Sequence, residues 1–296
     1  MKIRKLRISL APFFLAGLVF LLTLSLRIPS PKLPLAVVCG SHKVKIIDLS
    51  GTKVKTVWEW QASDDPCLDT LHFQKMDECK PINNGKQLLV TSSTGGCALL
   101  DTASKKALFY TYLPNAHSME LLFEDYVAVI ASSKPGGDRM IIYNWREGKQ
   151  LWEDSIFSGH GLAWVPERSS LYALGESELR RYHLKLSESL SLKQDTCYEL
   201  PSKGGHDLIW LPSKQSLVIS ASKNVWEFDL KTEKFAPHPL LHKSHKVKSI
   251  SFYRDKLLYV QAEESWWAHH IKLFNGPDIP VSDLRVYKAR WIYSHR

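Results

Sequence analysis

The sequence predicts an all-β fold, a six-bladed β-propeller whose first and last strands pair to close the ring. The first observation is a repeat: residues 158–166 and 204–212 share a glycine-rich turn, a histidine and an apolar strand ending in Trp, an aliphatic residue and Pro. The second is a spacing of roughly 40 residues, which is typical of four-stranded propeller blades. The third is that the folded region begins with three strands and ends with one. The alternative is an irregular all-β sandwich or barrel.

The copies of the repeat align on one position at the start of each first strand. The six residues at this aligned position are Asp77, His117, His160, His206, Lys248 and Tyr287. A strand follows each of them, and a second apolar strand follows a polar turn, as at residues 126–130 and 217–220. Third and fourth strands follow in several copies, as at residues 96–101 and 108–110. Their Val, Ile, Tyr and Trp content favours strand over helix.

The two ends of the folded region predict how the ring closes. Residues 35–40, 43–49 and 54–58 form strands two, three and four of a blade that lacks its innermost strand. Residues 287–293, at the end of the chain, supply a strand of the missing kind. Pairing the two ends completes this blade and leaves no exposed sheet edge at the junction.

The N-terminal part of the chain is predicted to anchor the protein in a membrane as a single-pass helix. Residues 8–26 carry no charge and are long enough to cross a bilayer core as a helix. A basic cluster before them holds the N-terminus in the cytoplasm and places the propeller on the outer, periplasmic or extracellular side of the cell membrane. The cluster consists of Lys2, Arg4, Lys5 and Arg7.

The predicted boundaries follow from this segment. Residues 1–34 hold the basic tip, the signal anchor and a proline-rich tether, and residues 35–296 form one propeller domain. A cleaved signal peptide is the alternative, because Thr23 and Ser25 form a weak cleavage site. The formal net charge is +9, but the first 34 residues hold six basic and no acidic residues. The propeller therefore carries little excess charge, which argues against nucleic acid as a partner.

Five cysteines are scattered along the chain, and none forms a CxxC pair or a zinc-ribbon spacing. An oxidising compartment permits a disulfide, and Cys67 with Cys79 is the preferred pair because both flank the connection into the second blade. The alternative is that Cys39 and Cys97 are ordinary buried strand residues. The connection itself, residues 61–76, is either a lid over one face or a surface loop.

Polar residues at the aligned position are expected to gather at the propeller axis. The first strand of each blade is innermost, so the residues at its start surround the mouth of the central channel. A position repeated only for packing would hold small or apolar residues. With Asp77 or Glu78 in the first copy and Lys288 or Arg290 in the last, this one holds imidazoles, a carboxylate and several cations. The predicted ligand-binding residues are Glu78, His117, His160, His206, Lys248, Lys288 and Arg290.

The histidines at this position have two interpretations. A single histidine at the start of a strand is commonly a turn residue that bonds the neighbouring backbone. Three in equivalent positions favour a site, and His117, His160 and His206 could ligate a divalent transition metal. Glu120 and Asp207 then either fix the imidazole tautomers or only cap loops.

Other clusters are given simpler interpretations. Lys248 and Arg290 bind an anion or form salt bridges across the channel mouth. His269 and His270 follow two tryptophans in a predicted strand, whose alternation sends the two rings to opposite faces, so they are interpreted as structural. The sequence contains no nucleotide-binding glycine loop, serine-hydrolase, zinc-protease or EF-hand motif.

Several short motifs carry a resemblance to a known family. They are Asp77-Glu78-Cys79-Lys80-Pro81, Pro114-Asn115-Ala116-His117-Ser118, Gly159-His160-Gly161, Gly204-Gly205-His206-Asp207-Leu208 and Tyr287-Lys288-Ala289-Arg290-Trp291. In combination they resemble a family of bacterial exported or membrane-attached six-bladed propeller proteins of unknown function. The resemblance covers nearly all of the chain beyond the anchor and implies the fold without implying an activity. A distant architectural likeness to oligogalacturonate lyases and calcium-dependent propeller lactonases slightly favours carbohydrate chemistry.

These observations predict a membrane-anchored, outward-facing propeller that binds a small anionic ligand, such as an acidic sugar or a glycan end, in an axial funnel. Falling pH is expected to charge the histidines and to tighten anion binding. One alternative is a lyase or hydrolase that acts on an acidic sugar with a divalent metal as cofactor. Another is a scaffold for a further protein of the cell envelope. The sequence assigns no catalytic residue.

Overall fold

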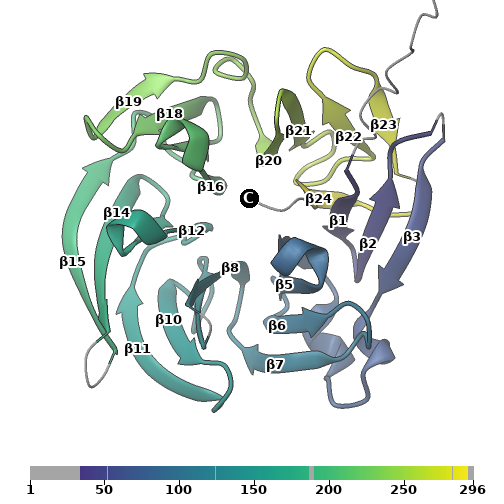
Figure 1. Ribbon diagram of the computed structural model, residues 1–296, viewed down its shortest axis with the longest axis horizontal. Helices are drawn as coiled ribbons and strands as arrows, with labels where there is room; N and C mark the ends of the chain where they lie inside the picture. Colours follow the sequence, from purple (N-terminus) through teal and green to yellow (C-terminus); the bar gives the residue numbers. More distant parts are fainter. Residues whose placement is uncertain (1–33, 52, 124, 187–189, 282, 293–296) are drawn as a thin grey trace, which may run out of the picture. The chain divides into compact units, whose positions relative to one another are not determined.

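The structure is a computed structural model that describes residues 34–51, 53–123, 125–186, 190–281 and 283–292. The chain divides into two units, Met1–Lys32 and Leu33–Arg296, and the described residues belong to the second. They form six four-stranded sheets, all with antiparallel pairing, set around a common axis (Figure 1). The predicted six-bladed β-propeller is confirmed.

The predicted membrane segment, residues 8–26, lies outside the described residues. Within the part of the chain that the structure describes, no helix is both long and apolar enough to cross a membrane.

The first three blades contain the N-terminal half of the propeller and its last strand. Blade 1 has the order β24 (Val286–Trp291), β1 (Ala36–Gly40), β2 (Lys43–Asp48) and β3 (Lys55–Trp60). Blade 2 consists of β4 (Met76–Ile82), β5 (Gln87–Ser92), β6 (Gly96–Asp101) and β7 (Ala107–Tyr112). Blade 3 consists of β8 (Ala116–Phe123), β9 (Tyr126–Ala131), β10 (Arg139–Asn144) and β11 (Lys149–Ser155).

The other three blades are simple meanders in chain order. Blade 4 consists of β12 (Gly161–Val165), β13 (Ser170–Leu174), β14 (Glu178–Leu186) and β15 (Leu190–Glu199). Blade 5 consists of β16 (Asp207–Leu211), β17 (Ser216–Ser220), β18 (Val225–Asp229) and β19 (Lys234–Pro237). Blade 6 consists of β20 (Val247–Tyr253), β21 (Lys256–Gln261), β22 (His270–Leu273) and β23 (Asp278–Pro280).

Short 3-10 turns connect several strands. Three of them, η3 (Asn83–Gly85), η4 (Pro166–Arg168) and η5 (Pro212–Lys214), join the first and second strands of blades 2, 4 and 5. In η4 and η5 the Pro of the repeated Trp-x-Pro motif begins the turn, where the missing amide hydrogen of proline costs nothing. The repeat detected in the sequence is therefore a strand followed by this turn.

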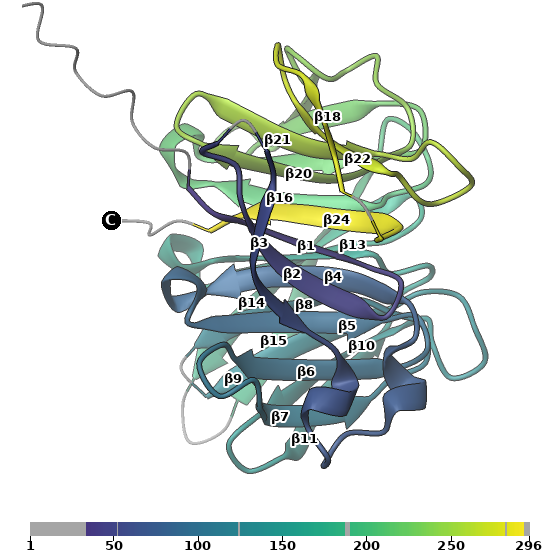
Figure 2. The same ribbon diagram turned by 90° about the vertical axis from the view of Figure 1, so that its right-hand side faces the viewer.

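Blade 1 closes the ring as predicted, because β24 is bonded along both of its edges. On one side it pairs with β1, with Ala36 opposite Trp291. On the other side the amides of Ala289 and Trp291 donate to the hydroxyls of Ser249 and Ser251 on β20, at 3.0 and 2.9 Å. Figure 2 shows β24 between these two strands. The seam therefore exposes no unpaired strand edge.

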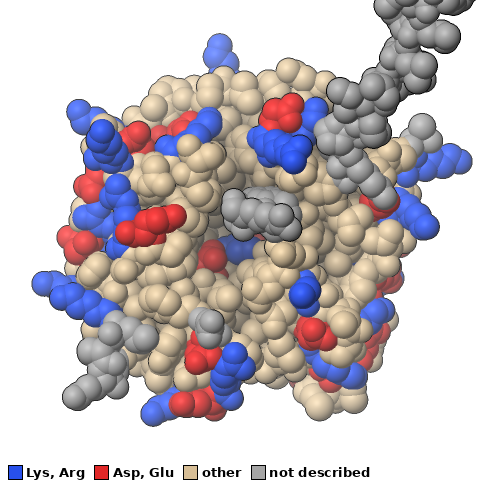
Figure 3. All heavy atoms as spheres, in the orientation of Figure 1, with Lys and Arg blue, Asp and Glu red and all other residues tan. Residues whose placement is uncertain are grey.

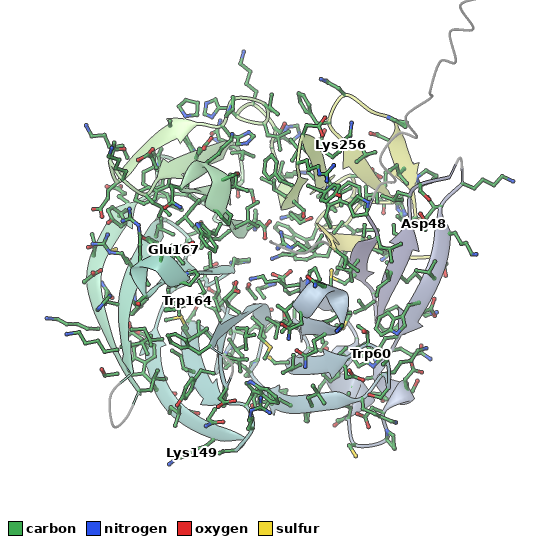
Figure 4. All side chains as sticks on the ribbon, viewed as in Figure 1. Asp48, Trp60, Lys149, Trp164, Glu167 and Lys256 are labelled. Atoms are coloured by element: carbon green, nitrogen blue, oxygen red, sulfur yellow. The ribbon has the colours of Figure 1, made fainter. Side chains whose placement is uncertain are left out.

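Apolar residues fill the spaces between neighbouring blades. Trp60, labelled in Figure 4, lies between blades 1 and 2 and meets the ring of Phe73 edge-on at 5.6 Å. Phe73 belongs to the connection from β3 to β4, which contains η1 (Ala62–Asp64) and η2 (Thr70–Phe73). The Ala107 amide of β7 donates to Asp65 of the same connection at 2.8 Å. This connection is therefore a surface loop that packs against blade 2, rather than a lid over one face of the propeller.

The predicted disulfide between Cys67 and Cys79 is wrong, because both are free cysteines. Cys79 is buried in β4, where its Sγ lies 3.6 Å from the carbonyl oxygen of Lys288. Cys67 is exposed in the preceding connection. The alternative interpretation is confirmed for Cys39 and Cys97, which are buried in β1 and β6.

The closing seam predicts a strong effect of one methyl group. A Cβ on Gly40, at the end of β1, would lie 1.7 Å from the carbonyl oxygen of Arg285, a backbone atom that cannot rotate away. Gly40→Ala should therefore lower the free energy of unfolding by about 1–3 kcal/mol or more, measured by urea unfolding. Gly51→Ala is the matched control, since the nearest heavy atom there is 3.6 Å away. Equal unfolding midpoints for the two variants would contradict the described seam.

Candidate functional site

The innermost strands β4, β8, β12, β16, β20 and β24 surround the axis, and each contacts the next (Figure 1). Their equivalent positions define three rings. The first ring is the aligned position itself: Asp77, His117, His160, His206, Lys248 and Tyr287. The second ring is one residue further along: Glu78, Ser118, Gly161, Asp207, Ser249 and Lys288. The third ring is two residues beyond that: Lys80, Glu120, Ala163, Ile209, Ser251 and Arg290.

β-Bulges explain why neighbouring residues belong to two successive rings. In a regular strand the side chains of the first-ring and second-ring residues would point to opposite faces of the sheet, because successive side chains alternate. In four blades the pairing register shifts at the first-ring residue, which is the extra residue of a bulge and can be re-aimed. These residues are Asp77, His117, Lys248 and Tyr287. In the other two blades, His160 and His206 immediately precede the first strand.

The structure brings the three predicted histidines together in the first ring. The rings of His117 and His160 are stacked, with centroids 4.3 Å apart and planes inclined by 13°. The ring of His206 meets that of His160 nearly at right angles, at 5.3 Å. Lys248 completes the row with its Nζ 3.1 Å from His206 Nε2. Tyr287 approaches His117 from the other side, at 6.1 Å.

This arrangement differs from the expected three-histidine metal site. Among the described residues, no group of three or more His, Cys, Asp or Glu side chains is placed to hold a metal ion. The physical reason is that stacked rings cannot aim their nitrogens at one point. His160 Nδ1 also lies 2.8 Å from the Ser158 carbonyl oxygen, and His206 Nε2 faces Lys248.

Burial controls the charges of the first ring. Loss of solvent lowers the pKa of His160 to about 4 and holds the pKa values of His117 and His206 well below the usual range. The same effect lowers the pKa of Lys248 to about 7 and raises that of Asp77 to about 7. The expectation that the histidines gain charge below pH 8 is therefore corrected: the groups that titrate near neutrality are Lys248 and Asp77.

The second ring and Arg290 form a buried ionic quartet on the axis, consisting of Glu78, Asp207, Lys288 and Arg290. Lys288 Nζ lies 3.1 Å from both Glu78 Oε2 and Asp207 Oδ1. Arg290 Nη2 lies 2.6 Å from Asp207 Oδ1 and 3.2 Å from Glu78 Oε1. Although burial opposes ionisation, the two cations hold the carboxyl pKa values below their ordinary range. Because two positive and two negative charges balance, the predicted ligand-binding residues Glu78, Lys288 and Arg290 are already paired with one another and with Asp207.

The other predicted acceptor, Glu120, lies in the third ring rather than beside the histidines. Its Oε2 accepts from Lys80 Nζ at 2.6 Å, and Lys80 also donates to the Leu162 carbonyl at 3.0 Å. The whole third ring lines a cavity of 430 Å³ at this end of the axis. Figure 3 looks onto this end, where the surface is hollowed near the axis.

Sequence reasoning missed Trp266, which lies over the histidine end of the axis. The predicted strand containing it is wrong, because β22 begins only at His270 and Trp266 lies in a preceding turn. Trp266 is 57% exposed, and Lys248 Nζ lies 4.6 Å from its ring centroid. His270 contacts Glu263 at the surface, at 2.9 Å. No periodicity in the sequence marks Trp266, since a turn carries none.

The fold and this axial polar cluster define the class of the protein, a six-bladed propeller with polar residues buried along its axis. The chain belongs to a family of unknown function, DUF6528, whose model matches residues 26–295. No curated protein sequence matches the chain.

Solved structures show the same fold at low sequence identity. A chain of the nidogen/laminin complex is similar at 11% identity and a TM-score of 0.60, over 88% of this chain and 98% of that one. Sqt1 of Saccharomyces cerevisiae is similar at 14% identity and a TM-score of 0.51, over 76% and 66%. A chain of the mitotic checkpoint complex is similar at 11% and 0.52, over 67% and 58%. At these identities the likeness concerns the fold alone.

The ionic quartet predicts a large cost for removing one charge. Asp207→Asn leaves Lys288 and Arg290 with one carboxylate, and an uncompensated buried charge costs about 3–5 kcal/mol. The free energy of unfolding at pH 7, measured with urea, should fall by that amount. In the wild type, this contribution is present above the carboxyl pKa of the unfolded chain and is lost as the pH falls toward the lower folded-state pKa values. Asp255→Asn is the control, since its side chain is 80% exposed; an equally small effect of both changes would contradict the quartet.

Proposed function

We propose that this protein binds a small anion, namely the carboxylate of an acidic sugar, at the first ring. The observation that carries the proposal is a buried imidazole atom without a hydrogen-bond partner, His206 Nδ1. His117 Nδ1 also makes no hydrogen bond, but Asp77 Oδ1 already faces it at 3.7 Å. Buried polar atoms are nearly always paired, and leaving one unpaired costs about 1–3 kcal/mol. A bound acceptor would recover this cost.

The tautomer of His206 supports an acceptor as the missing partner. When Lys248 carries its proton, its ammonium group can only donate, so His206 Nε2 must accept. The proton of the neutral imidazole is then on Nδ1, which is the unpaired atom. His206 and Lys248 therefore supply one neutral and one charged donor from adjacent blades.

The charges of the ring favour an anion below neutral pH. Under those conditions Lys248 is positive and Asp77 is uncharged, because both have a pKa of about 7. Above neutrality Lys248 loses its charge and Asp77 becomes negative. Since the histidines stay neutral, the sign of the ring depends on these two residues.

Trp266 supports a sugar as the carrier of the carboxylate. Its exposed ring lies over Lys248 and 6.4 Å from the ring of His206. The face of a sugar ring has C–H groups that pack on indole, while its carboxylate can reach the donors beneath.

The proposal is tested by isothermal titration calorimetry with galacturonic acid, whose carboxylate stays ionised from pH 6 to pH 8. Affinity should fall at least about tenfold over this range, because the ring changes from positive to negative. Lys248→Met should abolish binding at pH 6, whereas Lys243→Met, on the exposed surface, should leave it unchanged.

Two results would contradict this function. Affinity that is constant or rises toward pH 8 would exclude Lys248 and Asp77 as the groups that control binding. Conversion of oligogalacturonate to an unsaturated product, lost in Lys248→Met, would instead assign a lyase, because two groups with pKa values near 7 suit proton transfer.

The proposed location is the outer face of a membrane, which rests on the uncharged residues 8–26 and the basic cluster before them. Full-length protein expressed in a bacterial host should remain in the membrane fraction after alkaline washing. A variant without residues 8–26 should be recovered in the supernatant. Equal partition of the two forms would refute the anchor, and a shortened, released wild-type chain would indicate a cleaved signal peptide.

A further inference from the structure

We propose that the opposite end of the axis is a second binding site, which takes a neutral sugar ring. This site is the cavity of 430 Å³ bounded by the third ring. The quartet of Glu78, Asp207, Lys288 and Arg290 lies between it and the first ring. The proposal is therefore independent of anion binding at the histidines.

The shape of the cavity suits a compact ligand. Its volume lies within the range of about 300–1,000 Å³ that is common for small-molecule sites. The third ring surrounds the axis, so its residues line a socket rather than an extended groove. A single ring or the end of a chain fits such a socket better than an extended peptide does.

Aromatic side chains recur at the same position of four consecutive blades, directly after the third ring. These residues are Trp164, Trp210, Phe252 and Trp291, and all four line the cavity. Trp164 and Trp291 are buried walls, with 9% and 1% exposure, whereas Trp210 and Phe252 are only half-buried. The half-buried pair offers apolar ring surface that a ligand can cover.

Two indole nitrogens at this site lack partners. Nε1 of Trp210 and Nε1 of Trp291 are both buried and donate no hydrogen bond. An indole N–H is a donor only, so each needs an acceptor oxygen. A sugar carries many hydroxyl oxygens around a compact ring, which suits two donor residues from blades 5 and 1 that line one cavity.

The charges around the cavity favour a neutral ligand. Lys80 is paired with Glu120, and Arg290 is paired within the quartet. The six ionised groups of the second and third rings, three positive and three negative, therefore balance. Neither a cation nor an anion gains a net attraction there.

The ion pair of Lys80 and Glu120 favours a sugar over an apolar molecule. The side chains of Lys80 and Glu120 are 14% and 16% exposed, so their outer edges face the cavity. A hydroxyl group can donate to Glu120 and accept from Lys80. A purely apolar ligand would remove water from this pair without forming a hydrogen bond to it, which is costly.

The experiment measures the intrinsic tryptophan fluorescence and the binding heat of the full chain with three neutral disaccharides: maltose, cellobiose and diacetylchitobiose. At least one should bind saturably. Glu120→Gln and Phe252→Leu should each weaken that binding about tenfold, the loss of one good polar or apolar contact. Lys248→Met, at the other end of the axis, should leave it unchanged. Unfolding midpoints of all variants show that they are folded.

Three outcomes would overturn the proposal. The first is no saturable binding of any of the three sugars. The second is binding that folded Glu120→Gln and Phe252→Leu leave unaltered. The third concerns residues 293–296, which follow Ile292 after β24: if deleting them changes the fluorescence while neither form binds sugar, the cavity belongs to the C-terminal segment of the chain itself.

Discussion

The structure depends on the buried ionic quartet that joins blades 1, 2 and 5 across the axis. Glu78 comes from β4, Asp207 from β16, and Lys288 and Arg290 from β24. Desolvating four charges is costly, and the cost is offset only when every charge has close partners of the opposite sign. This requirement makes β24 the innermost strand of blade 1, where it also pairs with β1. Closure of the propeller and neutrality of its axis therefore depend on the same strand.

The quartet also determines what remains at the two ends. It pairs the charged residues of the second ring with Arg290, so the histidine end retains only groups whose ionisation depends on their surroundings. Burial keeps the imidazoles neutral, and it shifts the pKa values of Lys248 and Asp77 to about 7. The other end retains a neutral cavity with aromatic walls. One propeller axis thus offers two chemically different environments, a row of imidazole, lysine and carboxyl groups at one end and a cavity with aromatic walls at the other.

Much of the fold could be predicted because a propeller repeats its pattern. The third strand of blade 2 was predicted at residues 96–101, as β6 is observed, and the six aligned positions all begin or precede an innermost strand. Failures occurred where the repeat is interrupted. Trp266 lies in a turn of blade 6, where β22 is short, and Cys67 lies in the long connection before β4. Neither place has a periodicity from which a contact could be inferred.

The sequence by itself determined the number of blades, the closing strand and most of the polar residues that reach the axis, because these depend on local period and on repeat spacing. Lys80 was not among the predicted residues, although it lines the axial cavity. Only the tertiary structure decided which of those residues are paired and which are left without partners. Glu78 and Arg290 were both predicted as ligand-binding, yet they contact each other. His206 was predicted beside them, yet its Nδ1 has no partner. Partner choice, burial and pKa depend on distances across the ring, which the sequence does not contain. The β-bulges that re-aim a first-ring side chain also leave no mark in the alternation of apolar and polar residues.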